Sequence, residues 1–189
     1  LSQVATVAAA AKQFGVTEDA VRARLDKARK TLYAVRSKRV PPQKDDKVLA
    51  AWNGMAIAAL ARGYLALGEP RYLAAAQRAA AFVLSAMRQE DGRLYRSWRG
   101  GKPKLAAYLD DYGYVADGLT LLFQADFDPR WLAGARDLLG VVTKHFRDPK
   151  DGNFFYTADD HEALIQRPKP VHDDSQPAGN GVAARVLTR

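Results

Sequence analysis

Three clusters of acidic and aromatic side chains contain most of the residues that could do chemistry in this sequence. They are Asp45-Asp46 followed by Trp52-Asn53, Tyr108 followed by Asp110-Asp111-Tyr112, and His172-Asp173-Asp174 followed by Asn180. Closely placed carboxylates raise one another's pKa, which lets one act as an acid while another acts as a base. Aromatic faces beside carboxylates suit the apolar face and the hydroxyls of a sugar ring. The clusters therefore predict acid–base chemistry on a carbohydrate.

Two interpretations of the Asp-Asp pairs remain open. An aspartate just before a helix is a common N-cap, so a repeated pair can be a repeated cap. In the other interpretation, at least one pair faces a ligand. We expect Asp111 and Asp174 to be caps, and we expect Asp110, Asp173 and His172 to be catalytic. The residues expected to bind substrate are Asp45, Asp46, Trp52, Asn53, Tyr108, Asp111, Tyr112, Asp174 and Asn180.

Other kinds of site have weaker support. Metal donors occur in Asp159-Asp160-His161-Glu162 and in His172-Asp173-Asp174, but neither segment has a recurring ligand spacing. The sequence has no cysteine, which excludes thiolate ligands and thiol catalysis by this chain. Arg99-Gly100-Gly101-Lys102 lacks the context of a phosphate-binding loop. We therefore predict neither a metal nor a cofactor.

An internal repeat organises the elements that must position these clusters. Glu69-Pro70-Arg71-Tyr72-Leu73 recurs 59 residues later as Asp128-Pro129-Arg130-Trp131-Leu132. Asp91-Gly92 with Leu94-Tyr95 recurs 60 residues later as Asp151-Gly152 with Phe154-Phe155. Because two landmarks recur at nearly the same spacing, the sequence indicates stacked supersecondary units.

Each unit is predicted to be a helical hairpin. Residues 48–67 are apolar nearly all round, which is typical of a helix buried on every side. Residues 71–88 carry one apolar stripe, as do residues 129–146, where Leu132, Ala135, Leu139, Val142 and Phe146 form it. Pro129 with Asp128 as cap begins that second outer helix. The segments 91–104 and 148–172 are expected to be β-hairpins or long loops.

This order of elements predicts an all-α fold, part of an (α/α)6-type toroid with short β-hairpin loops. An open solenoid also stacks helix pairs, but long loops after every second helix favour a ring. A third inner helix is expected near Ala178, and it reaches Arg189 without a partner helix. We therefore expect the chain to be part of a longer protein. Its expected divisions are an N-terminal helical segment at 1–40, with a basic helix at 17–38, and hairpin repeats at 41–189.

Composition and charge limit the remaining function classes. No apolar run approaches the roughly 20 residues that cross a bilayer, so no membrane partner is expected. The lack of cysteine fits a cytoplasmic protein. The net charge of +8 permits nucleic-acid binding. Residues 7–32 also resemble a helix-turn-helix, with Gly15 before a basic helix. Because the pattern covers only a seventh of the chain, DNA binding is the third function hypothesis.

Beyond these patterns, the chain from Phe14 onward resembles the C-terminal helical region of the thioredoxin-domain-containing family that includes spermatogenesis-associated protein twenty. The motifs are Pro41-Pro42, residues 45–54, Leu109-Asp110-Asp111-Tyr112, Phe127-Asp128 with Trp131-Leu132, Gly152 with Phe154-Phe155, and Gly179-Asn180. The resemblance implies an N-terminal thioredoxin-like domain, absent from this chain, followed by a toroid of the six-hairpin glycosidase type. That toroid is similar to N-acylglucosamine 2-epimerases, in which histidines transfer protons.

Two function hypotheses follow. In the first, the chain handles a small sugar, as an isomerase or a glycoside hydrolase. In the second, it is a non-catalytic toroid that binds a protein partner or serves an attached thioredoxin-like domain.

Overall fold

The computed structural model describes residues 4–162 and 165–189, and the chain divides into two compact units at Asp45 and Asp46. The first unit contains helices α1 (Val7–Phe14) and α2 (Glu18–Arg36). Threonine hydroxyls cap both helices, and Gly15 ends α1 with a left-handed φ of 63°. Helix α2 has no buried residue. These are the two helices of the helix-turn-helix pattern, and DNA binding through them stays a prediction.

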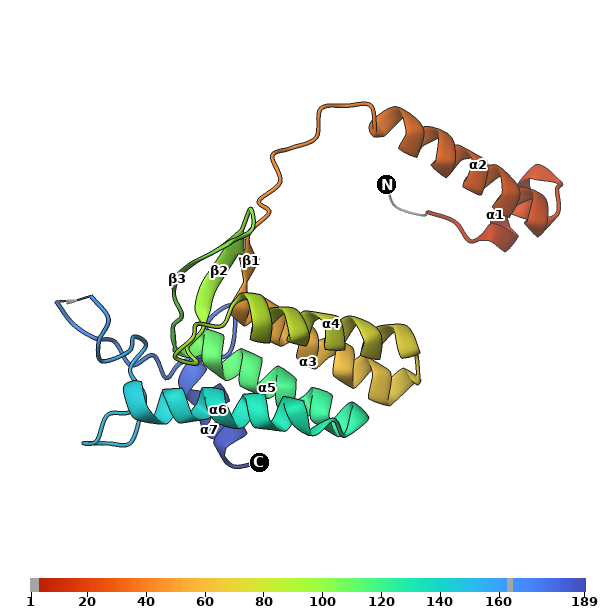
Figure 1. The fold of residues 1–189 in the computed structure, drawn as a ribbon. Helices are drawn as coiled ribbons and strands as arrows, with labels where there is room; N and C mark the ends of the chain where they lie inside the picture. The colour runs from red at the N-terminus through yellow and green to blue at the C-terminus, as the bar shows by residue number, and fades with distance from the viewer. Residues whose placement is uncertain (1–3, 163–164) are drawn as a thin grey trace. The chain divides into compact units, whose positions relative to one another are not determined.

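The second unit consists of two helical hairpins and a further helix (Figure 1). The first hairpin is α3 (Ala50–Leu67) with α4 (Pro70–Ala86), and the second is α5 (Leu109–Asp126) with α6 (Pro129–His145). Both first helices have 18 residues and both second helices have 17. Corresponding helices begin 59 residues apart. The predicted repeat is therefore a repeat of structure, and α7 (Gly179–Leu187) follows it as the expected third inner helix.

Short strands lie just before the first hairpin and between the two hairpins. β1 (Val48–Leu49), β2 (Tyr95–Arg99) and β3 (Lys102–Ala106) form an antiparallel sheet in the order β1-β2-β3. The predicted β-hairpin is thus confirmed for the first connection. The connection from α6 to α7 is a long loop with one isolated bridge, between Arg147 and Phe154, in its described part. Residues 163–164 of that loop lie outside the described residues. Figure 1 shows the hairpin and the loop at the same end of the helices.

Burial differs between the two inner helices. Helix α5 is buried nearly all round, with thirteen of its residues buried. The same prediction for α3 is wrong, because Trp52 is 61% exposed and Leu65 is 52% exposed. Helix α3 packs against α4 and α5, which leaves its remaining face open in this chain.

The outer helices bury one stripe each. In α4 the buried residues are Ala76, Ala80 and Val83, as the spacing predicts. In α6 they are Trp131, Gly134, Ala135, Leu138 and Val142, so the stripe is rotated by about one residue from the prediction. The cap at Asp128 is confirmed, since its carboxylate accepts from the Arg130 amide at 3.0 Å. Among the helices in the described ranges, none has the length and apolar character needed to span a bilayer.

Candidate functional site

Asp111 joins the beginnings of the two inner helices. Its Oδ1 accepts from the backbone amide of Ala51 at 3.0 Å, and its Oδ2 accepts from the amide of Tyr108 at 2.9 Å. Arg96 on β2 also donates to Oδ2, at 3.3 Å. The side chain is 1% exposed. Asp111 is therefore a cap, as predicted, and it serves α3 as well as its own helix.

Burial raises the pKa of Asp111 from 3.8 to about 6, although the Tyr108 amide, Arg96 and the Ala51 amide oppose the rise. A carboxyl whose folded-state pKa lies above its unfolded value binds its proton more tightly when folded. Its contribution to stability is full at low pH and is lost as the pH rises through about 6. We expect this contribution to increase by about 1 kcal/mol between pH 7 and pH 5.

The test compares denaturant unfolding of the wild type with that of Asp111→Asn, which cannot titrate, at both pH values. The stability gap between the two proteins should widen by that amount on acidification. A gap that narrows would mean that the hydrogen bonds to the ionised carboxylate outweigh the cost of burying it.

Asp110, the neighbouring aspartate in the first turn of α5, is held differently. Its Oδ1 is buried and has no hydrogen-bond partner among the described residues. Burial raises the pKa of Asp110, and this effect exceeds the opposing influence of Arg96 and of the Gly179 amide. The cause is loss of hydration, because Asp173 makes no contribution to this shift. The predicted effect of one carboxylate on another acts instead on the adjacent residue, because Asp110 contributes to the raised pKa of Asp111.

Basic and aromatic side chains surround Asp110. Tyr108 stacks on Tyr156, with ring centroids 4.8 Å apart, and the Arg96 guanidinium lies 4.7 Å from the centroid of the Tyr108 ring. Both Arg96 and Tyr156 interact electrostatically with Asp110. Neither Arg96 nor Tyr156 was predicted, although Tyr156 directly follows the repeated Phe154-Phe155 landmark. Because Tyr108 already contacts these two side chains, its ring is less open to a ligand than predicted.

Asp173 lies in the loop before α7, and it shares the neighbour Tyr114 with Asp110. The Tyr114 hydroxyl donates to the carbonyl of Pro177 at 2.5 Å, and both Asp110 and Asp173 act electrostatically on Tyr114. Asp173 Oδ1 accepts from the Ala178 amide at 2.9 Å, at the beginning of α7. The residue that caps is thus Asp173 and not Asp174, the reverse of our prediction for this pair. His172 and Asp174 are exposed in the loop beside it.

Two predicted ligand-binding residues instead hold the fold together. Tyr112 is 2% exposed, and its hydroxyl accepts from the Leu94 amide at 3.0 Å, so it cannot line a cleft as predicted. Asn180 is 6% exposed. Its side chain accepts a hydrogen bond from the backbone amide of Phe154 and donates one to the carbonyl of Phe154, both at 2.8 Å. Its amide nitrogen also donates to the Pro170 carbonyl at 3.0 Å. Long-range backbone partners therefore occupy both side chains.

The first predicted cluster is more open. Trp52 follows Ala51, whose amide binds Asp111, and its indole is exposed. Asn53 donates to the Leu49 carbonyl at 2.9 Å. Asp46 pairs with Arg99 at 2.5 Å, and Asp45 is the last residue of the first unit. Of this cluster, Trp52 is the residue with an exposed aromatic side chain.

A separate polar cluster involves His145, the last residue of α6. His145, Asp159 and Asp160 offer ligand atoms that all lie within 4.8 Å of one another. The Arg93 guanidinium already contacts this cluster, because it pairs with Asp160 at 2.6 Å and contacts the His145 ring at 3.2 Å. His145 also contacts Asp159 at 2.9 Å. The guanidinium offsets part of the negative charge that would attract a metal ion.

Sequence comparison identifies relatives of the whole chain. No family profile matches it. Spermatogenesis-associated protein 20 from Mus musculus is 33% identical over 189 residues, which cover 95% of this chain and 24% of that protein. The Homo sapiens protein is 32% identical with the same coverage. The chain therefore spans about a quarter of the length of the curated relatives that it matches, and the resemblance stated from its motifs is confirmed.

Solved structures establish the fold class. Cellobiose 2-epimerase from Spirochaeta thermophila matches 78% of this chain and 40% of its own, with a TM-score of 0.63 and 17% identity. A family 105 glycoside hydrolase from C. acetobutylicum matches 96% of this chain and 53% of its own, with a TM-score of 0.60 and 12% identity. The unsaturated glucuronyl hydrolase of Bacillus sp. GL1 matches 77% of this chain and 40% of its own, with a TM-score of 0.55 and 19% identity. The helical hairpins thus have the predicted (α/α)6-type fold.

Proposed function

We propose that this chain, a homologue of part of spermatogenesis-associated protein 20, carries part of a carbohydrate-processing site at the beginning of α5. The observation that carries the proposal is the state of Asp110. Its Oδ1 is buried without a partner, and burial raises its pKa. A buried acceptor without a partner costs stability, and such costs concentrate at sites that a ligand completes.

The chemistry proposed for Asp110 is general acid–base transfer. A raised pKa favours the protonated carboxyl more than in an ordinary aspartate, which suits donation of a proton to a sugar oxygen and its later return. Arg96 lies nearby and stabilises the ionised form that results. Asp173 supplies a second carboxylate, which like Asp110 acts electrostatically on Tyr114. The named activities of the structural neighbours, sugar epimerisation and glycoside hydrolysis, are both served by this set.

The binding surface proposed for the sugar is the indole of Trp52. It is the large aromatic side chain of the predicted clusters that stays open, since Tyr112 is buried and Tyr108 is stacked. Because the indole is 61% exposed, removing it should cost little stability.

A thermal-shift screen of monosaccharides, amino sugars and short oligosaccharides against the full-length protein tests this function. We expect a saturable rise in Tm with one sugar class, and Trp52→Ala should weaken the affinity about tenfold because the stacking surface is lost. Leu65→Ala is the matched control, an exposed apolar residue about 20 Å farther along α3. If no sugar raises the Tm of the folded protein, the carbohydrate proposal fails and a partner-binding toroid takes its place.

The same proposal extends to the domain organisation and the location of the full-length protein. The relatives are about four times as long as the matched region, so an attached thioredoxin-like domain and a cytoplasmic location are proposals about the whole protein. Cell fractionation of the full-length protein tests the location.

A further inference from the structure

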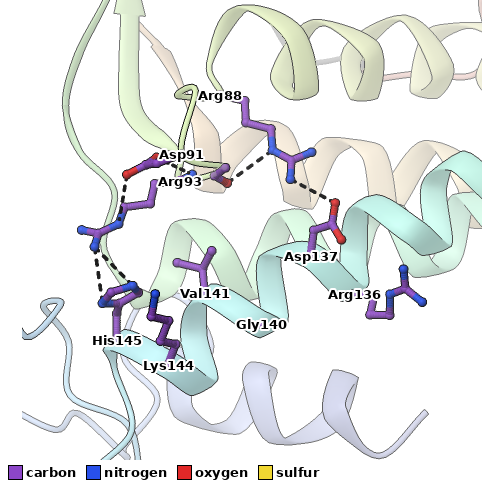
Figure 2. Close-up of a pocket in the computed structure, with 10 residues that line it drawn as sticks. Arg88, Asp91, Arg93, Arg136, Asp137, Gly140, Val141, Lys144 and His145 are labelled. Atoms are coloured by element: carbon purple, nitrogen blue, oxygen red, sulfur yellow. Dashed lines mark hydrogen bonds and ion pairs between the residues drawn. The ribbon is translucent and has the colours of Figure 1, made fainter.

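A pocket lies between α6 and the segment that follows α4, and it shares no lining residue with the Asp110 site (Figure 2). Its volume is about 410 Å³, which lies within the range of small-molecule sites. The end of α4, the following turn and α6 supply its walls. The lining residues that carry charge are Arg88, Asp91, Arg93, Arg136, Asp137, Lys144 and His145.

Two of the four cations in the pocket are fixed by carboxylates. Arg88 pairs with Asp137 at 3.1 Å and donates to the Gly92 carbonyl at 3.3 Å. Arg93 pairs with Asp91 at 3.4 Å and, outside the pocket lining, with Asp160. These contacts hold both guanidinium groups at the pocket wall, as the dashed lines in Figure 2 show. Their charges are largely balanced, so they supply oriented donors more than net charge.

The other two cations are not balanced. In the part of the chain that the structure describes, Arg136 and Lys144 have neither an ion pair nor a side-chain hydrogen bond. They lie on one line of α6, one turn before and one turn after Gly140. The pocket therefore contains two cations without a carboxylate partner, one on each side of Gly140 along α6.

Gly140 is an independent sign that the space is kept open. Glycine is less favourable than alanine in a helix interior, so it usually has a packing reason there. Gly134 on the same helix has one, because an added Cβ would lie 3.2 Å from Leu84 Cδ1. A Cβ at Gly140 would meet no atom within 4 Å. Packing does not require this glycine, and any side chain there would project from the floor of the pocket.

We propose that this pocket binds a phosphate group, carried by a small phosphorylated molecule or present as free phosphate. A dianion matches the two cations that have no carboxylate partner, Arg136 and Lys144, and Arg88 and Arg93 add hydrogen-bond donors in fixed positions. Asp91 and Asp137 also line the pocket and would repel an extended polyanion, which argues against a nucleic-acid backbone. The volume leaves room for the organic part of a phosphate monoester.

The first experiment measures binding of inorganic phosphate, glycerol 3-phosphate and glycerol to the full-length protein by calorimetry, at constant ionic strength. We expect saturable binding of both phosphates and none of glycerol. Tighter binding of glycerol 3-phosphate would identify a monoester as the ligand, whereas equal affinities would identify free phosphate. Arg136→Gln with Lys144→Gln should weaken phosphate binding at least about tenfold. Arg78→Gln, a change of an exposed arginine on α4, is the control and should leave it unaltered.

Two further variants keep the test independent of folding. Gly140→Ala should raise Tm and retain phosphate binding, while Gly140→Glu should keep the fold and abolish binding by filling and reversing the charge of the floor. Saturable binding that survives both Gly140→Glu and the double substitution would overturn the proposal. So would the absence of saturable phosphate binding, since the four cations would then be a solvated helix surface. Neither result bears on the sugar site, which the screen with Trp52→Ala tests separately.

Discussion

Replacing Asp110 by asparagine is expected to lower kcat for the sugar reaction about 100-fold to 10,000-fold while the protein stays folded. General acid–base transfer by a positioned carboxyl contributes a factor of this order, and an amide of the same shape cannot supply a proton. Folding should survive because asparagine has the same shape and keeps a side-chain oxygen that can accept from the Gly179 amide. The measurement is steady-state turnover of the sugar that the thermal-shift screen identifies, with circular dichroism of each variant.

The pH dependence gives this prediction a second readout. Burial raises the pKa of Asp110, so the limb of the kcat/KM profile that reports it should lie above the usual range for aspartate. In Asp110→Asn that limb should disappear from the residual activity. Asp137→Asn, which removes an exposed carboxylate from the outer helix α6, is the matched control and should retain full turnover. Full turnover by folded Asp110→Asn would exclude Asp110 as the acid–base residue.

The helical framework could be predicted from the sequence because its signals are local or periodic. Pro70 and Pro129 begin the two outer helices where the repeat places them, and Asp128 caps the second. The apolar stripes follow from spacing within a helix, so an error such as Leu139 for Leu138 displaces the stripe by only one residue. Periodicity could not show that one face of α3 is open, because it reports apolar character and not which neighbours are present.

The site was harder to predict because distant partners decide the state of each side chain. Asp110 and Asp111 are adjacent and identical, yet only Asp111 reaches the Ala51 amide, 60 residues away. The Asp173-Asp174 pair looks the same in sequence but uses its first member as the cap. Asn180 is occupied by Phe154, 26 residues earlier. Spacing correctly located the carboxylates near helix beginnings, whereas the assignment of each role required tertiary contacts.

The close approach of α3 and α5 sets the geometry of the whole site, and it rests on two glycines. A Cβ added at Gly118 would lie 2.6 Å from the carbonyl oxygen of Gly54, and one added at Gly54 would collide with the backbone of Tyr114 and Val115. Real Cβ atoms do not approach backbone so closely, and backbone in a packed helix cannot turn aside as a flexible side chain can. The helices would have to separate, which opens the buried contacts around Ile57 and Leu119.

Gly118→Ala is therefore expected to lower the free energy of unfolding by about 3 to 4 kcal/mol, at the upper end for overpacked cores. This loss outweighs the gain that alanine normally brings to a helix interior. Denaturant unfolding measures it, and Gly140→Ala is the matched control because its Cβ has free space and should stabilise the protein by about 0.5 to 1 kcal/mol. Equal stability of Gly118→Ala and the wild type would mean that α3 and α5 separate without cost. The separation would also move the Ala51 amide away from Asp111, so the same variant should lose sugar turnover even where it remains folded.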